Sequence, residues 1–167
     1  MILFFIDDAI SISEETLKTS SHGLNIKLLK EENLSLVLQG NYLSSVVDIF
    51  YIVFENIIRH SKLKTRPNVE ISLKHIGNTA YLTIENEIGD QVEVEQSNER
   101  IEAIKAAMKE GKYMKSISKE GGTGFHKILK ILSHEFSSPV TELDFGFKEN
   151  VMVKKNKRQN SLLFLHF

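Results

Sequence analysis

A chain of 167 residues is long enough to bury one substantial hydrophobic core, so we expect a single domain spanning residues 1–167. Its 41% hydrophobic and 26% charged residues are typical of globular proteins, and a formal net charge of -1 gives no electrostatic reason to expect nucleic-acid binding or contact with an anionic membrane. The absence of cysteine excludes disulfides and thiolate metal sites, and it fits a reducing cytoplasmic location.

The N-terminal part of the chain predicts a strand, a helix and two more strands. Residues 1–6, MILFFI, are apolar but too short to span a membrane. We expect a buried strand there, or the end of an element from a longer polypeptide of which this chain is the terminal domain. Ser13 and the acidic residues after it predict a helix start within 11–18, and alternating apolar residues predict strands over 24–29 and 33–40.

The longest periodic segment predicts a helix from Asn41 to His60, with apolar residues at steps of three and four. Asn56 shares a helical face with apolar Ile52 and Val53. A polar amide in such a stripe needs a partner, since leaving it unsatisfied costs about 1–3 kcal/mol. Asn56 is therefore either a core asparagine bonded to the backbone or a hard oxygen ligand for a phosphate-bound magnesium ion.

The second half of the chain predicts two hairpins and two helices. The predicted strands cover 69–76, 80–86, 140–147 and 160–167, and the predicted helices cover 98–112 and 125–136. The sequence GNT supplies turn chemistry between the first two of these strands. This order predicts an α+β fold, a two-layer sandwich with helices packed on one face of a mixed, mostly antiparallel sheet.

A glycine-rich segment, EGGTGFHK, stands immediately before the last predicted helix. Gly121, Gly122 and Gly124 fall within four residues. Backbone N–H groups without side chains around them can close on phosphate oxygens, and the helix dipole adds partial positive charge. Alternatively, Thr123 caps the helix and the glycines only permit a turn. The segment is not a Walker loop, because no Lys-Ser or Lys-Thr pair follows.

Taken together, VVDIFYIVFENIIRHSK, the paired strands, a helical stretch and EGGTGFHKILKIL resemble the GHKL (Bergerat-fold) ATPases. The similarity spans roughly residues 12–167, and it is strongest to the catalytic ATP-binding domain of sensor histidine kinases. The resemblance implies ATP and Mg²⁺ as cofactors and a protein phosphoacceptor or regulatory domain as partner. It implies neither nucleic-acid binding nor membrane contact by this chain.

The resemblance also implies roles for individual residues. Asn56 matches the magnesium-ligating asparagine, Arg59 matches the basic residue that reaches the phosphates, and His60 matches the aromatic or histidine after it. Gly122, Thr123 and Gly124 match the glycine box, and Gly121 leads into it. Residues 91–120 match the ATP lid in position, length and polarity.

Three positions depart from the family pattern, and the first is the adenine-recognising aspartate. The alternation of the strand places Asn86 there, with Glu85 as the alternative if the register slips by one residue. An asparagine carbonyl can still accept a hydrogen bond from the adenine amino group, without a charge. Of the glycines that normally follow, only Gly89 stands nearby.

The other two departures concern catalysis and the phosphate loop. Ile52 occupies the position of the glutamate general base in hydrolysing family members, and an aliphatic side chain cannot activate water. Glu55 points about 100° away around the helix. Self-contained ATP hydrolysis is therefore not expected, whereas a histidine kinase does not need that base. His126 replaces a further glycine, where it either crowds the phosphates or donates a hydrogen bond to one.

Three functions follow from this comparison. The first is an Mg-ATP-binding, histidine-kinase-like domain that presents the γ-phosphate to a partner phosphoacceptor. The second is a degenerate GHKL module that acts in protein interaction or regulation with weak catalysis or none. The third is an anti-sigma-type serine kinase, which shares the fold and differs in the acceptor.

Overall fold

The structure is a computed structural model that describes residues 3–18, 23–30, 37–76, 79–110, 124–134, 143–148 and 159–166. Within these ranges the helices are α1 (Ile6–Lys18), α2 (Leu43–His60), α3 (Val94–Lys109), α5 (Gly124–His134) and a short 3-10 turn, Gly40–Tyr42. The strands are β1 (Leu3–Phe5), β2 (Asn25–Lys30), β3 (Val37–Gln39), β4 (Asn68–Ile76), β5 (Thr79–Ile88), β6 (Leu143–Lys148) and β7 (Gln159–His166). Gly121, Gly122 and Thr123 of the predicted glycine box lie outside the described residues.

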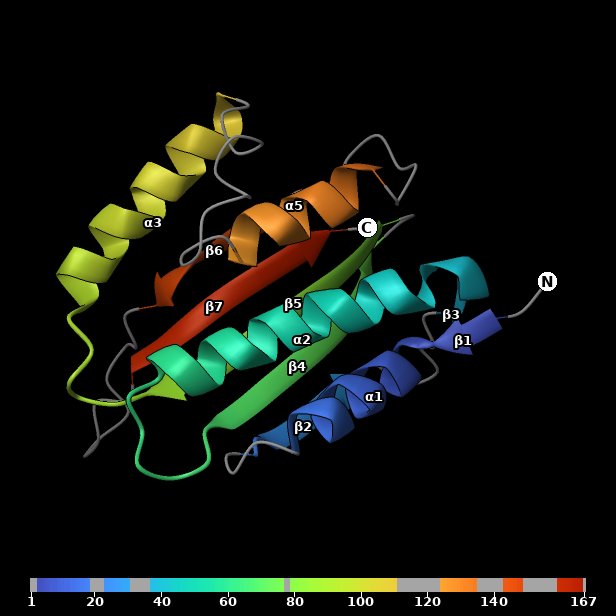
Figure 1. Ribbon diagram of the computed structural model, residues 1–167, viewed down its shortest axis with the longest axis horizontal. Coiled ribbons are helices and arrows are strands. Elements are labelled where there is room, and N and C mark those ends of the chain that lie inside the picture. The colour runs from blue at the N-terminus through green and yellow to red at the C-terminus, as the bar shows by residue number, and fades with distance from the viewer. Residues whose placement is uncertain are drawn as a thin grey trace.

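A five-stranded sheet forms one layer of the molecule, in the order β2-β4-β5-β7-β6. The β2–β4 pair is parallel, and the other three pairs are antiparallel. Strands β1 and β3 form a separate antiparallel pair. Figure 1 shows α1, α2 and α5 side by side across one face of the large sheet. The predicted fold class, helices on one face of a mixed and mostly antiparallel sheet, is confirmed.

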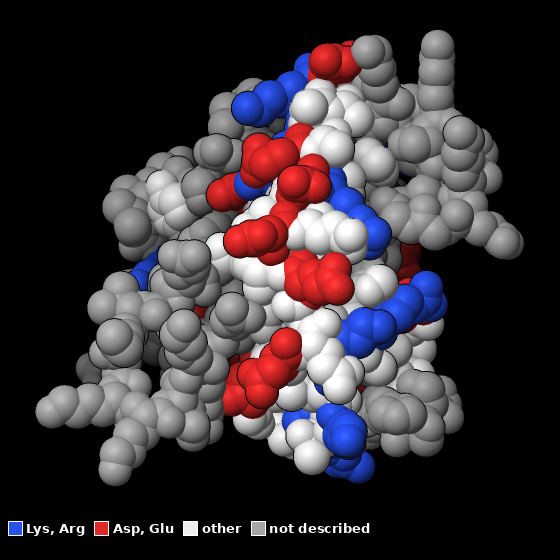
Figure 2. All heavy atoms as spheres, turned by 90° about the vertical axis from the view of Figure 1, so that its left-hand side faces the viewer, with Lys and Arg blue, Asp and Glu red and all other residues white. Residues whose placement is uncertain are grey.

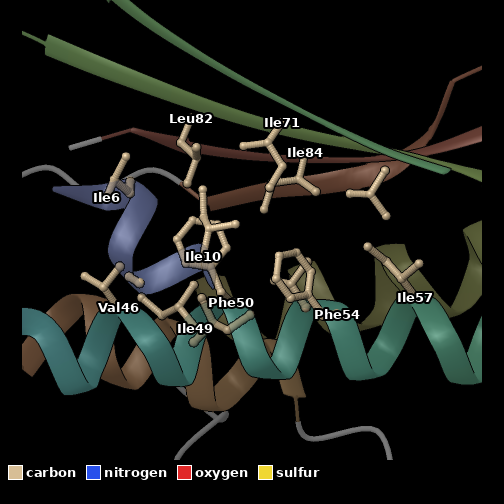
Figure 3. Packing of buried hydrophobic residues seen from close by; sticks show 14 of the residues in the cluster. Ile6, Ile10, Val46, Ile49, Phe50, Phe54, Ile57, Ile71, Leu82 and Ile84 are labelled. Atoms are coloured by element: carbon tan, nitrogen blue, oxygen red, sulfur yellow. The ribbon is translucent and has the colours of Figure 1, made fainter. Parts of the chain in front are cut away.

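The hydrophobic core lies between α2 and the sheet. Phe50 and Phe54 of α2 are both 0% exposed, and their rings point toward Ile71, Leu82 and Ile84 on the strands (Figure 3). Full burial of such a side chain contributes about 1.5–3 kcal/mol, so the contact between α2 and the sheet contributes strongly to the stability of the fold. Residues 40–60 also satisfy the length and composition of a membrane-crossing helix, but α2 is the central core helix here, and such helices pass the same test.

Helix α1 begins earlier than the sequence predicted. Its first residue is Ile6, and the apolar repeat of Ile6, Ala9 and Ile10 continues into a buried Ser13. Ser13 is therefore not at the helix start: its hydroxyl lies 2.7 Å from the carbonyl oxygen of Ala9 and 3.0 Å from that of Val47 in α2. Tertiary packing of the apolar stripe outweighed the local capping pattern.

The other boundaries differ less from the predictions. Helix α2 begins at Leu43, after the 3-10 turn, and α3 covers 94–109 where 98–112 was expected. Strand β3 covers only 37–39 of the predicted 33–40, and residues 33–36 lie outside the described part of the chain. Ends of regular elements are the part of a sequence reading that local patterns define least well.

Candidate functional site

The first residue of α5 lies directly against the polar position of α2. A Cβ atom added to Gly124 would stand 2.8 Å from Nδ2 of Asn56 and 3.1 Å from Cγ2 of Ile52. Both distances are shorter than ordinary van der Waals contact, so only glycine permits this approach without a shift. The structure thus brings Asn56 and the end of the glycine-rich segment together from distant parts of the sequence.

Packing of α5 explains how this approach is held. Ile128 and Leu132 lie on one face of α5 and are each 0% exposed, so the helix is anchored in the same core as α2. Asn56 is half-buried, between buried Val53 and exposed Arg59 on its own helix. The next residue, Ile57, is buried, so the buried side of α2 continues past Asn56 and the carboxamide stands at the margin of the core.

The C-terminal end of α2 carries positive charge. Arg59 is exposed, and its Nη2 donates to Oε1 of Glu55 at 2.7 Å, one helical turn earlier. His60 follows it at the surface, where partial burial, Arg59 and Lys62 lower the pKa of the imidazole against the opposing effect of Glu55. Cations at this end also complement the negative end of the helix dipole, a stabilising effect that involves no ligand.

Asn86 lies on the face of β5 that is turned toward the helices. It alternates with Leu82 and Ile84, pairs with Val69 of β4, and is 5% exposed. Its Nδ2 donates to the carbonyl oxygen of Glu87 at 2.8 Å. The alternative residue, Glu85, alternates onto the opposite face of the sheet. Of the two candidates for adenine recognition, only Asn86 is on the side of the sheet that α2 and α5 cover.

Gly89 has a structural task that the sequence reading missed. Its N–H donates to the carbonyl oxygen of Ser61 at 2.7 Å, and an added Cβ would stand 2.7 Å from the carbonyl oxygen of Lys62. Lys62 has a φ of 55°, the left-handed conformation that commonly follows a helix C-terminus and that glycine adopts most easily. The loop after β5 is thus fastened to the end of α2. The sequence gives one sign of this role: no glycine directly follows α2, although a helix end commonly needs one.

His126 is 6% exposed, and burial lowers the pKa of its imidazole. The side chain is therefore enclosed in the first turn of α5 instead of standing on the surface. At the position of the missing general base, Ile52 is half-buried next to Gly124. Residues 91–120 include α3, and their role as an ATP lid stays a prediction.

Among the described residues beside Gly124, Asn56 has a side chain of the kind that binds magnesium. The Asn56 carboxamide supplies a hard oxygen, and Mg²⁺ typically takes one or two protein oxygens and fills its remaining positions with water and substrate phosphates. Among the described residues, no group of three His, Cys, Asp or Glu could hold a metal ion. The donors present therefore fit a magnesium ion that arrives with a nucleotide.

The end of the molecule near the C-terminus of α2 carries charges of both signs. Figure 2, which views the left-hand side of Figure 1, shows Asp and Glu side chains running through the centre of this face with Lys and Arg beside them. Neither sign of charge therefore covers the described residues of this face alone.

Comparison with known protein families agrees with the resemblance found in the sequence. A family model described as "y4jQ C-terminal putative histidine kinase domain" matches residues 6–154, which is most of the chain. No curated protein matches the chain.

Solved structures of histidine kinases share the fold. They include Acinetobacter baumannii histidine kinase AdeS, the catalytic domain of histidine kinase ThkA and the mycobacterial sensor histidine kinase MprB, with TM-scores of 0.56, 0.55 and 0.52. Sequence identities are 14%, 11% and 15%, over 99%, 98% and 99% of this chain. The matched regions are 65%, 94% and 96% of those chains, so this chain spans less than two thirds of AdeS.

Proposed function

The chain belongs to this family of histidine kinase C-terminal domains, and we propose that it binds Mg-ATP and presents the γ-phosphate to a partner phosphoacceptor. The observation that carries the proposal is the contact between Gly124 and Asn56. This approach supports the proposal, because the Asn56 carboxamide then lies beside the N-terminus of α5, where backbone N–H groups and the helix dipole favour anions.

Each residue of the site has a defined part in this proposal. Asn56 holds the magnesium ion, which neutralises phosphate charge when bound, and the first turn of α5 donates N–H groups to phosphate oxygens. Arg59 exchanges the carboxylate of Glu55 for a phosphate, since both accept the same guanidinium donors. Asn86 contributes an amide oxygen as acceptor for the adenine amino group.

Catalysis in this proposal is positioning and charge neutralisation, without a general base from this chain. Ile52 stands where a base for water would be, so the acceptor side chain of the partner supplies the nucleophile. The reaction takes place in the cytoplasm, where ATP is available. We therefore expect phosphotransfer to a partner and very slow hydrolysis of ATP alone.

Calorimetric titration tests nucleotide binding directly. Wild-type protein is titrated with Mg-ATP, with Mg-ADP and with ATP in the presence of a chelator. We expect Asn56→Ala to lose the magnesium-dependent part of the affinity, about tenfold or more. Asn68→Ala is the matched control, because Asn68 is an exposed asparagine of β4 that bonds Asn25 and Glu87 away from the helices. No heat at millimolar nucleotide, or an unchanged isotherm for Asn56→Ala, contradicts the proposal.

A regulatory module with weak nucleotide binding is the second candidate. The observation that favours it is the hydrogen bond from Asn86 to the backbone of Glu87. The side chain at the adenine position is already engaged with its own strand, which would weaken its binding to adenine. Incubation with ATP labelled in the γ-phosphate and candidate partner domains separates the two. Transfer supports the kinase, and binding without transfer supports the module. Acid-stable phosphate on the partner instead identifies a serine kinase of the anti-sigma type.

A further inference from the structure

Helices α3 and α5 meet the edge strand β6 through four side chains, which we call the β6 cluster: Lys105 of α3, Phe125 of α5, and Asp144 and Phe145 of β6. The Asp144 carboxylate accepts from Lys105 Nζ at 2.8 Å and from the N–H of Phe145 at 2.9 Å. Lys105 Nζ stands 5.6 Å from the centre of the Phe145 ring, within cation–π range. The cluster thus joins α3 to the edge strand β6.

The same cluster reaches the candidate nucleotide site through one aromatic contact. The rings of Phe125 and Phe145 are stacked, with centroids 3.9 Å apart and planes 6° from parallel. Phe125 directly follows Gly124, which abuts the Asn56 carboxamide. The first turn of α5 is therefore held on one side by an aromatic ring of the edge strand and on the other by α2.

Lys105 keeps its charge in this arrangement. Burial lowers the pKa of its ammonium group, but the carboxylates of Asp144 and Glu102 together outweigh burial and leave the pKa raised. The cation beside the Phe145 ring is thus permanent at physiological pH, and it also ties α3 to β6.

We propose that Phe145 is a positioning residue: it sets the distance of the α5 N-terminus from Asn56, and Lys105 and Asp144 hold Phe145 in place. The proposal rests on the proposed function. A binding site has to be held within about 0.5 Å of its productive geometry, so a side chain that fixes a helix N-terminus can control phosphate affinity without touching the ligand. A contact of this kind acts on the phosphates and leaves the nucleoside end of the site unchanged.

Comparison of ligands with and without phosphates tests the proposal. Phe145→Leu should weaken Mg-ATP binding by about tenfold and change adenosine binding by less than about twofold. Phe145→Tyr keeps the stacked ring and should restore Mg-ATP affinity to within about threefold of wild type. Thermal unfolding of each variant shows that the measured protein is folded.

Lys105→Met tests the cluster from α3 and needs no change in the core. It should weaken Mg-ATP binding by about threefold, again without effect on adenosine. Lys27→Met is the matched control, because Lys27 forms an exposed ion pair with Glu70 across β2 and β4, at 3.4 Å. The control should leave the affinity for both ligands unchanged.

The outcomes separate this inference from the proposed function. If wild type binds Mg-ATP and Phe145→Leu loses adenosine and Mg-ATP affinity equally, or loses neither, Phe145 has no positioning role and the inference is overturned. If Lys105→Met and Lys27→Met behave alike, the link through α3 is overturned. If wild type binds neither ligand, the proposed function itself fails.

Discussion

Replacement of Gly124 by alanine is the sharpest test of the site geometry. The new methyl group would meet Asn56 Nδ2 at 2.8 Å and Ile52 Cγ2 at 3.1 Å. The carboxamide is the end of a flexible side chain and can rotate away, and the isoleucine methyl needs to yield by only a few tenths of an ångström. The substitution therefore displaces Asn56 while the backbone of both helices can stay in place.

The effects on stability and on binding should differ. Alanine in place of glycine favours a helix by up to about 1 kcal/mol, and crowding opposes that gain, so the free energy of unfolding should change by less than about 1 kcal/mol. A displaced carboxamide cannot hold the magnesium ion, and we expect Mg-ATP affinity to fall by about tenfold, which is about 1.4 kcal/mol.

A double-mutant cycle identifies the cause. Calorimetry on wild type, Gly124→Ala, Asn56→Ala and the double variant gives the coupling energy between the two positions. If the methyl group acts through the carboxamide, Gly124→Ala should change affinity by less than about twofold once Asn56 is alanine. Equal losses in the two backgrounds would show that the methyl group acts elsewhere, and would refute the assigned contact.

Three further predictions concern stability, each measured by urea unfolding. Lys62→Gly should raise the free energy of unfolding by about 0.5–1 kcal/mol, because glycine adopts the left-handed conformation at this position without strain. Lys62→Ala keeps the strain, so an equal gain from Lys62→Ala would contradict this reason. Stability should fall as pH drops below about 6.5, the pKa of unfolded histidine, because the folded pKa values of His126 and His60 are lowered. His126→Gln should make stability depend less on pH in this range. An unchanged pH dependence would show that the burial of His126 is not its cause. Asn86→Asp should destabilise by about 1–3 kcal/mol at neutral pH, since a carboxylate cannot donate to Glu87 O, and stability equal to wild type would show that this hydrogen bond contributes little.

The sequence predicted the features that depend on strong periodicity. The long apolar repeat of α2, the hairpin of β4 and β5 and the glycines before α5 identified the fold class. The resemblance of these segments to the GHKL ATPases implied that Asn56 and Gly124 belong to one nucleotide site, and the structure brings the two residues together. Strand alternation selected Asn86 over Glu85, because period-two patterning is unambiguous once one face is buried.

Features that depend on contacts between distant elements were not predictable. Ser13 reads as a helix start in isolation, but in the folded chain its hydroxyl lies between carbonyl groups of α1 and α2. Gly89 reads as the remnant of a nucleotide motif, and its closest contacts are with Ser61 and Lys62 at the end of α2. The stacking of Phe125 on Phe145 has no local pattern at all. In each case a partner is supplied by another element, so the local pattern around the residue does not reveal the contact.

The parallel pairing of β2 with β4 has a consequence for where this polypeptide can be shortened. Residues 25–30 pair with residues 68–73 along one side of β4, and among the described strands no other pairs with that side. In a protein trimmed to start after residue 30, β4 would be a solvent-exposed edge strand. Its unpaired backbone groups could then bind strands of other molecules. Such a trimmed protein would precipitate even though α2, α5 and the central strands were all retained.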